Sequence, residues 1–286
     1  MKRGTRSALP FTDTAQEETY RKRFMPLLAG MAAFLPCLLV SESKGSSRPL
    51  NFEFENSISN DDFVTLMRPF LAVTRFTFLH SAAPLGVTGF DIGVGVSGVS
   101  LPDSTMTIAK STLREGNDLN ETLIAPRLNI QKGLPFDIDL GATAIMPLGG
   151  DLIAAGAALQ WTVINSPSPA PNMALRVAHT MWFGTKSVQA QTTLAEGILS
   201  LGLPPGINVL VPYAGGGMMW TAAKASGEWT NPETQDSGAL DASFSEQMPY
   251  ALLGSQIAML PGFWLTVEAQ LAKTQRSYAA KIALAL

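Results

Sequence analysis

Apolar residues alternate with small or polar residues along the last ten positions of the chain, residues 277–286. One face carries Tyr278, Ala280, Ile282, Leu284 and Leu286, and the other carries Ser277, Ala279, Lys281, Ala283 and Ala285. Successive side chains of a β-strand point to opposite faces, so this spacing predicts a strand with one apolar face. The alternation recurs upstream, first at Phe90, Ile92, Val94 and Val96.

The pattern predicts an all-β fold with about ten strands from residue 85 onward, and ten to twelve in the whole chain. Glycine and proline mark several of the turns between them, as at residues 132–135 and 147–150. The expected strands are residues 85–97, 122–132, 136–144, 151–163, 173–183, 188–200, 207–222, 250–260, 263–272 and 277–286. Residues 61–75 fit either an amphipathic helix or an irregular first strand, and residues 61–80 leave room for two more strands.

Two of the expected connections are long, residues 101–120 and 226–246, and they follow the first and seventh strands. In an up-and-down meander, alternate connections lie at the same end, so both long connections share one end. Long external loops over short periplasmic turns are typical of outer-membrane barrels. We therefore expect both long loops at the cell surface and, with an even number of strands, both chain termini on the periplasmic side.

The composition combines few charges with many apolar residues. Only 15% of the residues are charged and 46% are hydrophobic, whereas about a quarter are charged in soluble proteins. After residue 41 no apolar run approaches the roughly 20 residues of a membrane helix. This distribution favours a single antiparallel transmembrane β-barrel, with a soluble β-sandwich or soluble barrel as the alternative. The net charge of −3, without a basic patch, argues against nucleic-acid binding.

The N-terminal region resembles an export signal. A basic stretch, residues 21–23, precedes an apolar run of 17 residues, 24–40, which small and polar residues follow. The run is short and holds two prolines, which disfavours a membrane anchor, and the residues before Cys37 lack the small side chain that lipidation requires. We therefore divide the chain into a signal-peptide-like segment, 1–43, an N-terminal extension, 44–83 (helix or irregular strand), and a barrel, 84–286.

Four stretches carry a resemblance to a known family. They are residues 84–93 (PLGVTGFDIG), 126–135 (PRLNIQKGLP), 212–217 (PYAGGG) and 278–286 (YAAKIALAL). In this order they resemble uncharacterised outer-membrane β-barrel proteins of Gram-negative, mostly proteobacterial, bacteria. The resemblance implies a location in the cell outer membrane, with outer-membrane lipid and the barrel-assembly machinery as partners. Such proteins usually end in an aromatic residue, whereas this chain ends in Leu286.

The sequence indicates no catalytic, cofactor or metal site. His80 and His179 are far apart, and neither has the spacing of a metal ligand. No nucleophile elbow or phosphate-binding loop occurs. The single cysteine, Cys37, lies in the N-terminal apolar run, so the mature chain would have no disulfide. The five tryptophans fit an interface girdle or barrel packing. We therefore expect no enzyme and no cofactor.

Charged residues recur on the faces that we expect to point into the lumen. They are Asp91, Arg127, Asp137, Asp139, Arg176, Glu268 and Lys281. They either neutralise one another inside a filled barrel or line a selective lumen, and a barrel of this size is normally close to filled. In the last hairpin, a turn centred between Thr274 and Gln275 would place Glu268 opposite Lys281 and predicts a salt bridge there.

Three functions follow from this reading. The first is a small outer-membrane barrel that serves as a narrow channel, a ligand-uptake protein for a small molecule or lipid, or a structural membrane component. The second, a secreted or periplasmic barrel that binds a hydrophobic ligand, requires a polar outer face, which the strands do not show. The third, an outer-membrane lipolytic enzyme, requires a nucleophile, a base and an orienting group, and only His179 is placed as a base. We favour the first.

Overall fold

The computed structural model describes residues 52–114, 119–147, 152–166, 170–202 and 210–286. These residues belong to one compact unit, Ser47–Leu286. The expected signal-like segment, 1–43, lies outside the described residues, as does the greater part of the loop expected after the sixth strand. No helix within the described ranges is long and apolar enough to cross a membrane.

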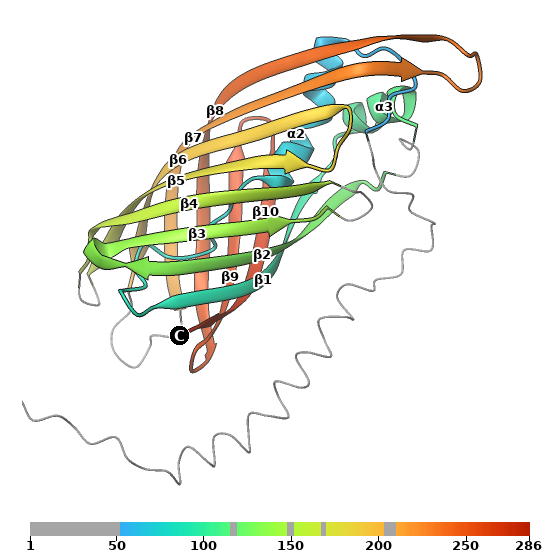
Figure 1. Cartoon of the computed structure of the whole chain (residues 1–286). Helices are drawn as coiled ribbons and strands as arrows, with labels where there is room; N and C mark the ends of the chain where they lie inside the picture. The colour runs from blue at the N-terminus through green and yellow to red at the C-terminus, as the bar shows by residue number, and fades with distance from the viewer. Residues whose placement is uncertain (1–51, 115–118, 148–151, 167–169, 203–209) are drawn as a thin grey trace, which may run out of the picture. The chain divides into compact units, whose positions relative to one another are not determined.

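Ten antiparallel strands close into a barrel, which confirms the fold class expected from the alternation (Figure 1). The strands are β1 (Phe90–Ser100), β2 (Thr122–Leu134), β3 (Ile138–Ile145), β4 (Ile153–Ile164), β5 (Pro171–Phe183), β6 (Val188–Leu201), β7 (Leu210–Thr230), β8 (Ser237–Leu260), β9 (Phe263–Ala272) and β10 (Arg276–Ala285). Each strand pairs with its neighbours in the chain, and β1 pairs with β10 to close the sheet.

The outer and inner faces of the strands differ in chemistry. On β1, Ile92 is 42% exposed on the outside, while its neighbour Asp91 is 1% exposed on the inside. On β5, Leu175 and Val177 are exposed and Arg176 between them is buried. The outer face is therefore apolar and the inner face polar, which is the reverse of a soluble barrel.

Strands β7 and β8 are much longer than the others and stay paired as far as Thr230 and Ser237. Residues 226–246, expected to form a loop, are therefore mostly strand. The alternation is present in this hairpin, but with the opposite polarity. The side chains on the inner face of this part of β8 are Leu240, Ala242, Phe244 and Met248. The exposed side chains on its outer face are Asp241, Ser243, Ser245 and Gln247. The other expected loop, residues 101–120, contains helix α3 (Asp103–Thr112).

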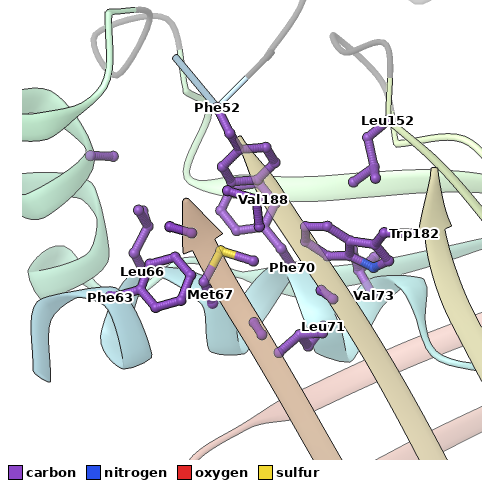
Figure 2. Packing of buried hydrophobic residues seen from close by; sticks show 14 of the residues in the cluster. Phe52, Phe63, Leu66, Met67, Phe70, Leu71, Val73, Leu152, Trp182 and Val188 are labelled. Atoms are coloured by element: carbon purple, nitrogen blue, oxygen red, sulfur yellow. The ribbon is translucent and has the colours of Figure 1, made fainter. Parts of the chain in front are cut away.

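Helix α2 (Asn60–Thr74) answers the question that the sequence left open for residues 61–75. Ser59 caps it by accepting a hydrogen bond from the amide of Asp62. Its apolar side packs against α3, the β7–β8 hairpin and the ends of neighbouring strands, as Phe70, Trp182 and Val188 show in Figure 2. Arg68 binds Glu246 through two hydrogen bonds of 2.8 and 2.9 Å, which join the helix to β8.

Between α2 and β1 the chain runs through the inside of the barrel. Residues 75–85, which we call the lumenal segment, have no helix or strand conformation, and residues 75–82 are all buried. Inward side chains of β2, β3, β4, β5, β6, β8 and β10 bond to it. The last residues of the expected N-terminal extension, 75–83, thus lie in the barrel interior.

We predict that Gly133→Ala destabilises the barrel where the chain leaves the lumen. A Cβ atom at Gly133 would lie 2.0 Å from the carbonyl oxygen of Gly86, a backbone contact that cannot relax by rotation of a side chain. Such overpacking costs about 1–3 kcal/mol. The midpoint of urea unfolding of the barrel in detergent, followed by tryptophan fluorescence, measures the effect.

The matched control is Gly98→Ala on β1. A Cβ atom there meets only the carbonyl oxygen of Leu123, at 3.9 Å. We expect a change within about 0.5 kcal/mol for this substitution. Equal effects of the two substitutions would contradict the path of the chain past β2.

Candidate functional site

The barrel interior is the candidate site, and most of the expected inward charges are found there. Six residues are buried on inner faces of the strands: Asp91, Arg127, Asp139, Arg176, Glu268 and Lys281. Asp137 is not among them. Strand β2 continues to Leu134, and Asp137 falls in the following turn, η2 (Pro135–Asp137), where its carboxylate accepts a 3.3 Å bond from Asn165. The strand expected at residues 136–144 begins at Ile138, so Asp137 lies in the turn and not on an inner face of the sheet.

Arg176 binds the lumenal segment directly. Its Nη2 atom donates to the carbonyl oxygens of His80 and Ser81, the latter at 3.0 Å. Its Nη1 atom lies 3.1 Å from Glu196 Oε1, and its Nε atom donates to Gln160 at 2.7 Å. Because a guanidinium presents its donors in a rigid fork, this one side chain fixes the segment against two strands at once.

Uncharged side chains of the wall bind six further backbone groups of the segment. The contacts are Asn129 to Thr77 O (3.0 Å), Gln131 to Phe78 O (2.7 Å), Thr162 to Ala82 O (2.8 Å), Phe76 N to Thr180 (3.0 Å), Ser81 N to Gln256 (3.0 Å) and Ala82 N to Ser200 (3.1 Å). An extended segment cannot bond to itself, and a buried backbone group without a partner is costly. The polar wall therefore provides what a neighbouring strand would provide in a sheet.

The last hairpin has a different register from the one expected. Ala272 and Gln275 bond to each other across a two-residue turn, and Lys281 lies opposite Thr266 while Glu268 lies opposite Ala279. The expected salt bridge between Glu268 and Lys281 is therefore wrong. Lys281 Nζ instead lies 2.8 Å from Asp91 Oδ1 on β1, with both side chains buried.

Two tyrosines bind the carboxylates that remain. Tyr213 donates to Glu268 at 2.8 Å, and Gln270 binds the other oxygen of that carboxylate. Tyr250 donates to Glu196, which also pairs with Arg176. The interior is thus a connected polar network that includes the lumenal segment. Amide and hydroxyl side chains belong to this network as well as ion pairs.

The histidines and tryptophans lie on different sides of the wall. His80 is buried in the lumenal segment, whereas His179 is exposed on the outer face, with Nδ1 2.8 Å from Thr193 Oγ1. Trp182 points inward and donates to Thr74 at 2.8 Å, while Trp220 is exposed on the outside. Within the part of the chain that the structure describes, no group of three His, Cys, Asp or Glu residues could hold a metal ion.

Comparison with known proteins gives matches at the level of architecture. No family model matches the chain, and no curated protein matches it. Among solved structures, it matches the N-terminal β-barrel domain of Pseudomonas aeruginosa OprF (11% identity, 70% of this chain and 99% of that chain, TM-score 0.31) and Ail of Yersinia pestis (12%, 70% and 99%, 0.29). It also matches the KdgM porin (8%, 68% and 98%, 0.33). These matches are outer-membrane β-barrels of Gram-negative bacteria, and TM-scores of this size carry no argument about ligand or activity.

The sequence reasoning missed the lumenal segment and the residues that bind it. The available signal was the accumulation of inward amides and hydroxyls, such as Asn129, Gln131, Gln160 and Thr162, on two strands. Side chains of this kind do not neutralise charges, and inside a closed barrel they require hydrogen-bond partners. A further clue is that residues 76–85 contain no charged residue.

We predict strong coupling between Asp91 and Lys281 in a double-mutant cycle of unfolding free energies. Removing one partner of a buried ion pair leaves a buried charge and costs about 3–5 kcal/mol. Lys281→Met should therefore be much less harmful in an Asp91→Asn background. The same cycle with Glu268→Gln is the control, and a larger coupling of Lys281 to Glu268 than to Asp91 would contradict the register of β9 and β10.

Proposed function

We propose that this protein is an integral outer-membrane β-barrel whose lumen is closed by its own lumenal segment. In this proposal it acts as a structural membrane component and not as an open channel. The observation that carries the proposal is the hydrogen bonding of the segment to side chains on seven strands, β2 to β6, β8 and β10. Leaving the lumen would break these bonds and expose a charged, poorly hydrated wall.

The location in a membrane is supported by the outer face of the barrel. Exposed apolar side chains lie on the outside of nearly every strand: Ile92, Val94, Leu128, Ile130, Leu140, Leu159, Val177, Met181, Leu253 and Val267. Contiguous apolar surface of this kind is rare on soluble monomers. The exchange of polarity along β8 supports the same location, because Asp241, Ser243 and Ser245 face outward where β8 extends past the end of β9, which pairs with β8 only from Tyr250 onward.

We assign the orientation of the barrel from the size of the connections at its two ends. Strand β1 begins beside the end of β10, where Phe90 and Leu286 exchange backbone hydrogen bonds of 2.9 and 2.8 Å. The short turn at residues 261–262 lies at this end, because Ala285 N bonds to Gly262 O. We assign this end to the periplasm, and the end with α2, α3 and the β7–β8 hairpin to the cell surface.

The closed lumen predicts little or no ion conductance. Purified protein inserted into planar lipid bilayers should give no steady open-channel steps at moderate voltage, because the segment and the side chains bound to it occupy the path. Arg176→Gln, which removes the bonds to His80 and Ser81 carbonyls, should give more frequent transient openings. Long-lived conductance of the unmodified protein, of the size expected for an empty barrel, would contradict the closed state.

The location and orientation are tested by fractionation and surface labelling. The protein should remain with the outer-membrane fraction, and its mobility on gels should change on heating as the barrel unfolds. An epitope inserted in the turn at residues 231–236 should be labelled on intact cells. The same epitope at residues 261–262 should be labelled only after permeabilisation, and the reverse result would overturn the orientation.

A further inference from the structure

Strand β8 has an edge without a neighbouring strand where the β7–β8 hairpin extends past the barrel (Figure 1). Strand β7 pairs with one edge of β8 as far as Ser237, whereas β9 pairs with the other edge only from Tyr250 onward. We call the part of this second edge at residues 239–249 the free edge. An unpaired strand edge presents backbone N–H and C=O groups that an added strand can bind.

Two contacts show which backbone groups point to the free edge. On β7, the amide of Ser226 donates away from β8, to Ser187 O at 2.8 Å. Ser226 lies opposite Asp241, and opposite residues of an antiparallel pair turn their backbone groups either towards each other or both away. The amide of Ser243, two residues on, donates to Asn60 Oδ1 on α2 at 3.0 Å and not to β7. The residues of β8 with this orientation are Ala239, Asp241, Ser243, Ser245 and Gln247.

The contact with Asn60 shows what the free edge binds. The side-chain oxygen of Asn60 stands where the carbonyl oxygen of an added strand would lie. Within the described part of the chain, the amides of Asp241, Ser245 and Gln247 have no acceptor of this kind. The side chains of these three residues are exposed, so an extended polypeptide can reach the backbone between them.

The hairpin around the free edge is acidic. Residues 224–249 hold five carboxylates and a single lysine, Lys224. Glu246 pairs with Arg68. The other four carboxylates are exposed and form no ion pair among the described residues: Glu228, Glu233, Asp236 and Asp241. A negative potential of this kind attracts a basic partner and repels a second copy of the hairpin.

Two residues limit self-association at the free edge. Pro249 has no backbone N–H, and Asp241 places a charge beside the edge. Proline and charged side chains are the means by which proteins keep strand edges from pairing with like edges. A carboxylate repels another acidic edge, but it favours an added strand that carries lysine or arginine.

We infer that the free edge is a docking site for an extended, basic polypeptide segment of another protein. The segment adds to β8 as a further strand, with backbone hydrogen bonds to Ser245 and Gln247 and with basic side chains near Asp241. Where the added strand extends further, Asn60 releases the amide of Ser243 by rotation of its side chain. The location of this site outside the cell rests on the proposed orientation, whereas the binding itself does not.

The test uses the whole protein in nonionic detergent and a fluorescent synthetic peptide of alternating lysine and threonine, about nine residues long. Fluorescence anisotropy should show saturable binding that weakens as the salt concentration rises. A peptide with glutamate in place of lysine should not bind. Asp241→Asn should weaken binding of the lysine peptide about threefold.

Ser245→Pro and Ser245→Ala form the matched pair of variants. Both remove the same hydroxyl, but only proline removes the amide of the free edge, and proline is tolerated on strand edges. We expect Ser245→Pro to weaken peptide binding about tenfold and Ser245→Ala to leave it within about twofold. Equal binding by the two variants would overturn the docking site.

If Ser245→Pro lacks the heat-modifiable mobility of a folded barrel, hydrogen exchange of the unmodified protein decides the matter. The peptide should slow exchange at the amides of Ser245 and Gln247, and unchanged rates overturn the site. Dimerisation without peptide that Ser245→Pro abolishes, measured by light scattering, also overturns it and assigns the free edge to a second copy. None of these measurements depends on conductance or orientation, so failure here leaves the closed-lumen proposal standing.

Discussion

The backbone of residues 75–85 must be hydrogen-bonded inside a closed barrel, and most of the interior is organised around this requirement. A strand satisfies its backbone with its neighbours, but the lumenal segment has no neighbouring strand within reach. Side chains of the wall take that role, as Asn129 does for Thr77 O and Thr180 for Phe76 N. The charged residues then follow from the same need, because Arg176 binds two carbonyls of the segment and must itself be paired with Glu196.

The polarity of the outer face changes along a strand with the surroundings of each part of that strand. Along β8, Leu253 is exposed and apolar where β9 runs beside the strand, whereas Ser243 is exposed and polar in the extended hairpin. The inner face changes in the opposite sense, from Gln256 in the lumen to Phe244 against α2. The strand β8 thus has a polar inner face in the lumen and an apolar inner face in the hairpin. Helix α2 packs against this apolar part of the hairpin.

The sequence was sufficient for those features that depend on local alternation. The strand β9 (Phe263–Ala272) was located correctly, and most others were correct to within a few residues, because each strand has an apolar outer face and a polar inner face. Local alternation does not predict which residues of neighbouring strands pair with each other. A turn centred one residue earlier shifts every pair by two positions, which is why Lys281 lies opposite Thr266 and not Glu268. The lumenal segment was missed because its partners are 50 to 200 residues away, and no local pattern reports such contacts.

The distance of these contacts along the chain also constrains how the barrel assembles. The segment precedes β1, yet it bonds to Thr180 on β5, Gln256 on β8 and Ser277 on β10. Contacts between such distant residues form only after the loops between them are closed. Until β10 pairs with β1, the carbonyls of the segment and the guanidinium groups of Arg127 and Arg176 remain hydrated and stabilise little. We therefore expect closure of the sheet to stabilise the interior network and the barrel together, with the segment enclosed as β10 pairs with β1 and not threaded in afterwards.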